Sequence, residues 1–322
     1  MILVTGATGF IGSHFVERAV EEGRRVRCLV RRSSSFKQLP AAAELAFGDL
    51  GGNVGLSEAL EGVDFVVHLA GVTKARTQAE YYHGNVEATT NLVRAAGSVK
   101  RFVHVSSLAA AGPSEVTKPV REDAMARPVS NYGRSKLAGE QAVLGSSVRD
   151  RAVIIRPPVV YGPRDRDVFQ VIRAVSKGWM FRIGTAERQF SVIYVMDLVE
   201  GLFAALDRQG VDGRTFFLAH AQAVSWDEFG AAAARLMGRK LRTASIPEML
   251  AYSLGSGAEW WTRVTGKPGV LSRDKIAEAC CDGWVCDPAC ARRDLGFCAR
   301  TGLEEGLRLT LDWYREARWL RI

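Results

Sequence analysis

The stretch that decides the fold is Thr5-Gly6-Ala7-Thr8-Gly9-Phe10-Ile11-Gly12, which directly follows the apolar start of the chain. Three glycines at a spacing of three predict a tight turn between a first strand and a first helix. Such a turn lets the backbone approach a pyrophosphate, and the N-terminus of the helix presents free N–H groups to the phosphates. The start of the chain therefore predicts a dinucleotide-binding unit.

Short β-branched runs alternate with helical patterns through the first half of the chain. The predicted strands are Ile2–Thr5, Arg25–Val30, Leu45–Phe47, Phe65–Leu69, Phe102–Ser106 and Ala152–Arg156. The predicted helices between them are Ile11–Glu22, Leu56–Leu60, Asn85–Ala96 and Tyr132–Gly145. This alternation predicts an α/β fold, a Rossmann-type doubly wound parallel sheet with helices on both faces. Sheets of this kind bind ligands at the carboxyl ends of their strands.

Helical patterns dominate after about residue 163. They cover Phe169–Lys177, Trp226–Met237, Pro247–Val264 and Leu303–Arg318, with short strands near Ser191–Val195 and Thr215–Leu218. We predict a dinucleotide-binding domain over residues 1–165, rejoined by about 190–207, and a smaller, mainly helical substrate-binding lobe over 166–322. The apolar segment Ile246–Val264 is interpreted as a buried core helix, with a lid over a hydrophobic substrate as the alternative.

Composition narrows the class of protein. The 322 residues are 47% hydrophobic and 24% charged, as in ordinary globular proteins. Neither a membrane-spanning run nor a signal peptide is recognisable, which predicts a cytoplasmic protein without a membrane partner. The net charge of +8 is dispersed along the chain, so nucleic-acid binding is not expected. Five of the six cysteines lie between Cys280 and Cys298, but no Cys-x-x-Cys pair occurs, so reduced thiols and no metal site are expected.

The residues after the second and third predicted strands bear on the cofactor. An NAD site would carry an acidic residue at the end of the second strand, where this chain has Arg31-Arg32. A guanidinium can bind the 2′-phosphate of NADP(H), so NADP(H) is favoured over NAD(H). Asp49 is expected to accept a hydrogen bond from the adenine amino group. The small residues of Leu69-Ala70-Gly71 let a cofactor lie close to the backbone, and His68 before them is interpreted as a core residue.

Tyr132 and Lys136 stand four residues apart in a predicted helix, so their side chains share one face. A nearby cation is expected to lower the pKa of the tyrosine, which would make Tyr132 a general acid or base near neutral pH. Ser107 ends the fifth strand, at the edge where ligands bind, and can donate to a substrate oxygen. We prefer it to Ser106 because only one of two successive strand residues can point into the cleft.

These residues resemble the extended short-chain dehydrogenase/reductase family. The resemblance rests on motifs spread over nearly the whole chain: TGATGFIG at 5–12, GDL at 48–50, HLAG at 68–71, Asn85, SS at 106–107, YGRSK at 132–136, RPPVVYGP at 156–163, RQFSVIYVMDL at 188–198 and DLGFCARTGLEEGLRLTLDWYRE at 294–316. By this likeness Ser107, Tyr132 and Lys136 form the catalytic set, and Asn85 organises the active-site helices. A homodimer through the helices Asn85–Ala96 and Tyr132–Gly145 is also implied.

The resemblance and the residues above predict one set of cofactor contacts. It comprises Gly6, Thr8, Gly9, Phe10, Ile11, Gly12, Arg31, Arg32, Asp49, Leu50, Leu69, Ala70, Gly71, Val105, Tyr132, Lys136, Pro157 and Val159. Tyr161, Arg164 and Tyr194 are expected on the substrate side.

Three functions remain open at this point. The first is NADP(H)-dependent reduction of a ketone, or oxidation of a secondary alcohol, on a small molecule that could be hydrophobic. The second is an NDP-sugar epimerase with retained NAD(P), in which Arg164, Arg166 and Arg188 would bind the pyrophosphate. The third is a non-enzymatic NADP(H) sensor, which the intact Tyr132 and Lys136 disfavour. Sugar dehydration is disfavoured because the residues after Ser107 supply no second acid.

Overall fold

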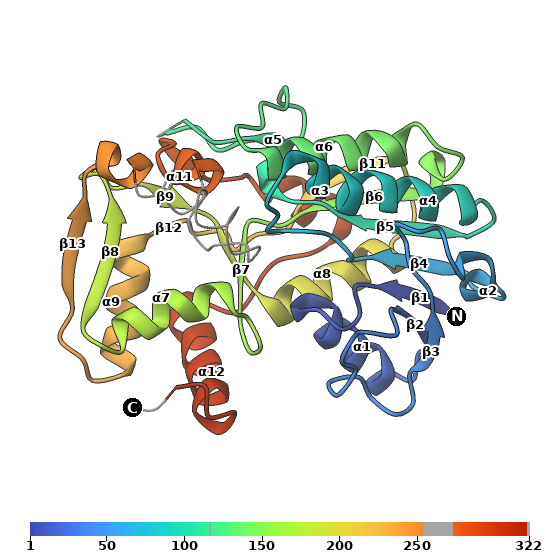
Figure 1. Cartoon of the computed structure of the whole chain (residues 1–322), viewed down its shortest axis with the longest axis horizontal. Coiled ribbons are helices and arrows are strands. Elements are labelled where there is room, and N and C mark those ends of the chain that lie inside the picture. Colours follow the sequence, from blue (N-terminus) through green and yellow to red (C-terminus); the bar gives the residue numbers. More distant parts are fainter. Residues whose placement is uncertain (116, 254–272, 321–322) are drawn as a thin grey trace.

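The computed structural model describes residues 1–115, 117–253 and 273–320. A large lobe built on a parallel sheet lies beside a smaller mixed lobe, and the chain starts in the first and ends in the second (Figure 1). The predicted segment Pro247–Val264 extends beyond the described residues: only its first part is covered, where residues 248–253 are helical.

A seven-stranded sheet forms the centre of the large lobe. Its order is β11-β6-β5-β4-β1-β2-β3, and every neighbouring pair is parallel. The strands are β1 (Ile2–Thr5), β2 (Val26–Val30), β3 (Glu44–Phe47), β4 (Phe65–His68), β5 (Arg101–Val105), β6 (Ala152–Arg156) and β11 (Arg214–Phe217). The order reverses between β1 and β4, which is where sheets of this kind bind dinucleotides. The predicted fold class is confirmed.

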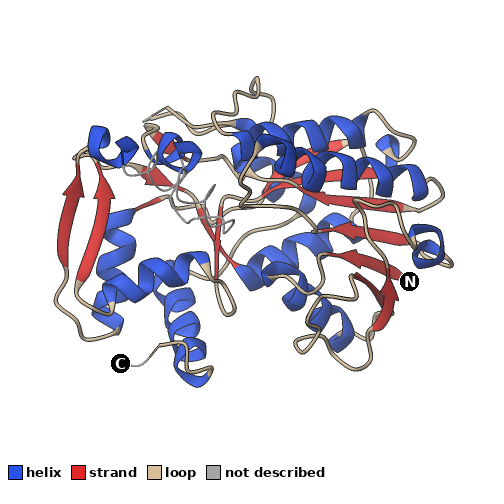
Figure 2. Cartoon of the chain, in the orientation of Figure 1, coloured by secondary structure: helices blue, strands red, loops and turns tan. Residues whose placement is uncertain are grey.

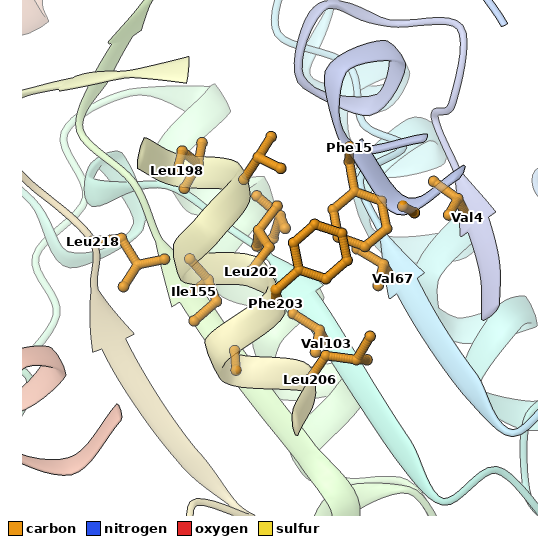
Figure 3. Packing of buried hydrophobic residues seen from close by; sticks show 14 of the residues in the cluster. Val4, Phe15, Val67, Val103, Ile155, Leu198, Leu202, Phe203, Leu206 and Leu218 are labelled. Carbon is orange, nitrogen blue, oxygen red and sulfur yellow. The ribbon is translucent and has the colours of Figure 1, made fainter. Parts of the chain in front are cut away.

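Helices cover both faces of this sheet (Figure 2). They are α1 (Phe10–Glu21), α2 (Leu56–Leu60), α3 (Gln78–Tyr82), a π-helix (His83–Glu87), α4 (Ala88–Ala95), α5 (Leu108–Ala111), α6 (Asn131–Leu144), a 3-10 turn (Arg149–Arg151) and α8 (Val195–Asp207). Figure 3 shows α1 and α8 meeting on one face, where Phe15 and Phe203 stack at 4.6 Å above Val67 and Val103. On the other face the core includes Leu92 of α4 and Val143 of α6.

One predicted strand belongs elsewhere than expected. Thr215–Leu218 was assigned to the second lobe, but β11 pairs with β6 at the edge of the first sheet. Its residues Phe216 and Phe217 are both fully buried, because helices and loops cover both faces of the strand. Continuous burial of this kind is typical of strands in parallel α/β sheets. The chain therefore returns to the first lobe at α8 and again at β11.

The second lobe combines short strands and helices around its own core. Its strands are β7 (Val159–Tyr161), β8 (Trp179–Ile183), β9 (Gln189–Phe190), β10 (Val192–Tyr194), β12 (Val224–Ser225), β13 (Arg242–Ile246) and β14 (Gly283–Trp284). Its helices are α7 (Asp167–Val175), α9 (Trp226–Leu236), α11 (Arg273–Ala279), a π-helix (Ala291–Leu295) and α12 (Leu303–Glu316). A capping box of Ser225 and Glu228 begins α9, and its buried face includes Phe229 and Ala233.

Two observations concern the classes of site that composition addressed. No described helix has the length and apolar character that crossing a membrane requires. Among the described residues, no group of three or more His, Cys, Asp or Glu side chains is placed to hold a metal ion. All six cysteines are free thiols.

Candidate active site

The glycine turn between β1 and α1 packs so closely against its own backbone and the end of β4 that it has no room for side chains at Gly6 and Gly12. Gly6 has φ +70°, and a Cβ there would lie 2.6 Å from the amide nitrogen of Ala70. A Cβ on Gly12 would lie 2.2 Å from the carbonyl oxygen of Gly6. Helix α1 begins after Gly9 with no side-chain cap, so its first N–H groups remain available to an anion. The turn fits the pyrophosphate of a dinucleotide.

The ends of β2 and β3 place the predicted adenosine-side residues along one edge of the sheet. Arg31 and Arg32 follow β2 directly and are exposed, and the Arg32 guanidinium lies 5.2 Å from the centre of the Phe47 ring. Asp49 is exposed on a turn whose backbone pairs with Val54. Leu50 is buried next to it. This edge of the sheet thus presents two cations after β2 and a carboxylate after β3. The end of β2 itself carries no carboxylate.

A cavity of about 550 Å³ lies at the carboxyl ends of the strands, between the two lobes. It brings Ser107, Tyr132 and Lys136 together. The predicted cofactor residues that also line it are Phe10, Ile11, Leu69, Gly71, Val105, Pro157 and Val159. The remaining ones lie outside its wall, near the ends of β1 to β4: Gly6, Thr8, Gly9, Gly12, Arg31, Arg32, Asp49, Leu50 and Ala70.

Ser107 is held by its place at the N-terminus of α5. Its Oγ accepts a hydrogen bond from the Ala109 amide at 3.1 Å, and its side chain hydrogen-bonds Tyr132. Ser106 also lines the cavity, but its hydroxyl is buried and has no hydrogen-bond partner among the described residues. The geometry therefore couples Ser107, rather than Ser106, to the phenol.

The charge state of Tyr132 differs from the sequence-based expectation. Burial raises the pKa of Tyr132, against the hydrogen bond from Ser107 and the charge of Lys275, which lower it. Lys275, rather than the expected Lys136, is the cation that lowers the pKa of Tyr132, and the Lys136 ammonium donates to the Val105 carbonyl at 2.8 Å. Burial lowers the pKa of Lys136 to about 8. Tyr132 is thus a neutral phenol at neutral pH.

Asn85 lies behind the cavity, within the π-helix that links α3 to α4. Its Oδ1 accepts from the Val72 amide at 2.7 Å, and its Nδ2 donates to the Val72 carbonyl and to Ser135 Oγ, both at 2.9 Å. The amide therefore joins the loop after β4 to α6, the helix that carries Tyr132 and Lys136. A π-helical turn often marks a functional position.

Helix α11 of the second lobe brings three charged residues that sequence reasoning missed. The Lys275 ammonium lies 5.4 Å from the centre of the Tyr132 ring and donates to Glu278 Oε2 at 2.9 Å. Glu278 Oε1 accepts from Ser130 Oγ at 2.5 Å, and Asp274 accepts from the Asn131 amide at 2.9 Å. These contacts dock α11 on the first turn of α6. No local motif marks them, because the pairing depends on how the lobes pack.

The residues expected on the substrate side lie elsewhere. Tyr161 and Tyr194 are buried in the core of the second lobe, where their rings meet edge to face at 5.8 Å. Arg164 forms an ion pair with Glu17 at 2.6 Å. None of the three lines the cavity. The second lobe instead contributes apolar residues to the wall of the cavity: Phe190, Trp226, Trp284, Val168, Val171 and Ala279.

Comparison with known proteins decides the family. The model of the NAD dependent epimerase/dehydratase family matches residues 2–219. The chain belongs to this family. The match spans the glycine turn, the cavity-lining ends of β4, β5 and β6, and the helix with Tyr132 and Lys136.

Relatives of this epimerase/dehydratase-family chain include reductases and sugar-nucleotide-binding proteins. The ceramide reductase of Caulobacter vibrioides is 31% identical over 99% of this chain and 96% of its own length. The 4-hydroxy-2-methyl-3-oxo-4-farnesyl-3,4-dihydroquinoline-1-oxide ketoreductase of Stigmatella aurantiaca is 27% identical over 94% and 93%. The solved structure of MoeE5 with UDP-glucuronic acid and NAD is 29% identical, with a TM-score of 0.79 over 98% and 99%.

Together these findings establish the class of protein. The chain is an NAD(P)-dependent oxidoreductase of the extended short-chain dehydrogenase/reductase type. The resemblance found in its motifs is confirmed.

Proposed function

We propose that this enzyme uses NADPH to reduce a ketone on an apolar small molecule, or NADP⁺ to oxidise the corresponding secondary alcohol. The observation that carries the proposal is the meeting of Ser107, Tyr132 and Lys136 in one largely apolar cavity beside the glycine turn. The charge state of Tyr132, the end of β2 and the wall of the cavity support the direction of the reaction, the cofactor and the substrate class in turn.

The chain's own residues supply the proton. When bound, a reduced nicotinamide supplies a hydride. Tyr132 donates its phenolic proton to the carbonyl oxygen of the substrate, while the Ser107 hydroxyl donates a second hydrogen bond to that oxygen. Because burial raises the pKa of Tyr132, the phenol carries its proton at neutral pH. This charge state suits reduction, and oxidation of the alcohol requires a higher pH.

The preference for NADP(H) rests on the end of β2. Arg31 and Arg32 are exposed there, where an NAD-specific site would place a carboxylate on the ribose hydroxyls. Guanidinium groups bind phosphate through paired, charge-assisted hydrogen bonds. The 2′-phosphate of NADP(H) is the part of the cofactor that such groups would recognise.

An apolar substrate fits the wall of the cavity. Phe190, Trp226 and Trp284 face it from the second lobe, and the two relatives with the ketoreductase and ceramide reductase names share nearly the full length of this chain. Among the described residues, the cations at the wall are Lys74, Lys136 and Lys275. Lys74 pairs with Asp167 and Lys275 with Glu278, so both are largely neutralised by carboxylates.

A sugar-nucleotide epimerase is the second candidate, favoured by the likeness to MoeE5. The arginines expected to bind a pyrophosphate do not reach the cavity. Arg164 pairs with Glu17, Arg188 with Glu248, and Arg166 lies 5.8 Å from the Trp319 ring. This arrangement weighs against a nucleotide diphosphate substrate.

A substrate screen tests the proposal. The purified enzyme is incubated with NADPH and a set of long-chain ketones, alongside UDP-glucose, and NADPH oxidation is followed. We expect turnover with a ketone, and a Tyr132→Phe variant should lose about 10²- to 10⁴-fold in kcat. Its affinity for NADPH should stay within about twofold, because the change removes only one hydroxyl from the predicted set of cofactor contacts. Interconversion of UDP-sugars without net NADPH oxidation would favour the epimerase.

A further inference from the structure

The small sheet of the second lobe has one uncovered face. Strands β8 and β13 pair in parallel, with Trp179 opposite Arg242 and Phe181 opposite Ala244. Met180, which points to the opposite face, is buried in the lobe's core. In Figure 1 this pair forms the outer edge of the molecule, with α9 on its inner side. Parallel sheets normally have both faces covered, whereas in the described part of the chain the outer face of this pair carries the exposed side chains of Trp179 and Phe181.

Two large aromatic side chains stand on this outer face. Trp179 is 41% and Phe181 55% exposed, and their rings stack at 6.2 Å with an angle of 14°. The Arg242 guanidinium lies 5.8 Å from the centre of the Trp179 ring. Large exposed apolar side chains that lie together mark candidate sites for a protein or membrane partner, and the cation–π contact keeps a positive charge beside this pair.

Four cations gather where β8 and β13 begin. They are Lys177, Arg239, Lys240 and Arg242, and all four are exposed. The backbone holds their segments together, since the Arg242 amide donates to the Gly178 carbonyl at 2.9 Å. Within residues 1–115, 117–253 and 273–320, none of the four forms an ion pair. The combined positive charge of these four side chains favours an anionic partner.

Further exposed apolar residues follow β13 along the chain, on the way to α11. β13 ends at Ile246, and the following helical residues include Met249 (82% exposed) and Leu250 (51% exposed). Tyr252 of this stretch hydrogen-bonds Cys280, which directly follows α11. Ala279 of α11 lines the cavity. Five of the ten exposed large hydrophobic side chains among the described residues lie on β8 or in the stretch that follows β13: Trp179, Phe181, Met249, Leu250 and Tyr252.

We propose that this strip docks the protein on the surface of an anionic lipid bilayer. We define the docking strip as Trp179, Phe181, Met249 and Leu250 with the cations Lys177, Arg239, Lys240 and Arg242. Aromatic and aliphatic side chains enter the headgroup region, and lysines and arginines bind acidic headgroups. A second copy of the chain would bring a second set of the same four cations into the contact, whereas anionic lipid supplies the opposite charge.

The docking strip goes beyond the proposed function and does not depend on it. The expectation of no membrane partner rested on the lack of a membrane-spanning run, and that observation does not address a peripheral contact. A strip that reaches from the outer sheet to the wall of the cavity would hold the cavity close to a lipid phase.

Vesicle binding tests the proposal on the full chain. The protein is sedimented with vesicles of phosphatidylcholine alone and of phosphatidylcholine with 30% phosphatidylglycerol, at low and high salt. We expect binding to the anionic vesicles that weakens at high salt. The Trp179→Ser/Phe181→Ser variant should bind about tenfold more weakly. The Lys177→Gln/Arg239→Gln/Lys240→Gln variant should lose about a hundredfold, at about fivefold per cation. Met125→Ser, which alters a residue 78% exposed in the other lobe, should bind as the unaltered chain does.

Two results would overturn the proposal. One is an unaltered chain that stays in the supernatant with both kinds of vesicle. The other is a Trp179→Ser/Phe181→Ser variant that binds vesicles as the unaltered chain does but has half its mass when sedimented without vesicles. That result would assign the strip to the contact with a second copy of the chain. Because the assay uses no substrate and no cofactor, its outcome is separate from that of the ketone screen.

Discussion

The charge of Lys275 provides a direct test of how the second lobe influences the proposed proton donor. Replacing Lys275 with Met removes an ammonium that lies 5.4 Å from the centre of the Tyr132 ring. It also leaves the Glu278 carboxylate without this partner, and that negative charge raises the pKa of Tyr132. Both effects have the same sign. We therefore expect the pKa of Tyr132 to rise further in Lys275→Met.

The size of the effect follows from the distance and the exposure. At 5.4 Å and an effective dielectric constant of about 20, one unit charge contributes about 3 kcal/mol. The Lys275 side chain is 41% exposed, so solvent reduces this toward the value of about 1 kcal/mol for surface pairs. That energy corresponds to an upward shift of about 0.7 pKa unit.

The titration of Tyr132 can be followed without a substrate. Tyrosine labelled with ¹³C at Cζ is incorporated, and the Tyr132 signal is assigned by its absence in Tyr132→Phe. Lys275→Arg, which keeps the charge, should titrate close to the unaltered enzyme, and Glu278→Gln should shift the pKa downward. Circular dichroism checks that each variant is folded over the pH range. A Tyr132 signal in Lys275→Met that titrates at the same or a lower pH would refute this reasoning.

Three further results are expected. Arg31→Ser/Arg32→Ser should weaken NADPH binding about 10- to 100-fold in a fluorescence titration and leave NADH binding unchanged, since only the 2′-phosphate contact is lost; equal losses for both cofactors would contradict the assignment. Gly12→Ala should abolish dinucleotide binding, because its Cβ would lie 2.2 Å from a backbone oxygen, whereas Gly302→Ala, with nothing within 4 Å, should not. Asp165, whose pKa burial raises to about 6, binds more protons when folded, so its contribution to stability is lost as pH rises from about 4 to 6. In chemical denaturation, the free energy of unfolding of Asp165→Asn, relative to that of the unaltered chain, should thus rise by about 3 kcal/mol between pH 4 and 7. A difference between the two proteins that stays constant over this range would count against this reasoning.

The first lobe could be predicted from local patterns in the sequence. The glycine turn and the run before it specify β1 and α1 within a few residues, because backbone sterics act over that range. The four-residue spacing of Tyr132 and Lys136 places both at the cavity for the same reason. These features depend on neighbours in the sequence, which is why sequence reasoning found them.

Features that depend on tertiary packing were missed or misassigned. Nothing near Thr215 tells that its strand crosses back to pair with β6, more than fifty residues earlier. Lys275 stands near Tyr132 only because α11 docks on α6. Tyr161, with its polar end, was expected near substrate, yet the second lobe buries it completely. The pKa of Tyr132 likewise depends on burial, which spacing along a helix does not report.

On the proposed function, the enzyme takes up NADP(H) and exchanges it, rather than holding a resident NAD. The most direct measurement denatures the purified protein, identifies any released nucleotide, and titrates nucleotide-free protein with NADPH and NADH. We expect nucleotide-free protein that binds NADPH about a hundredfold more tightly than NADH, a difference of about 2.7 kcal/mol. One equivalent of NAD⁺ released from the denatured protein would contradict it, and would direct the search for a substrate to sugar nucleotides.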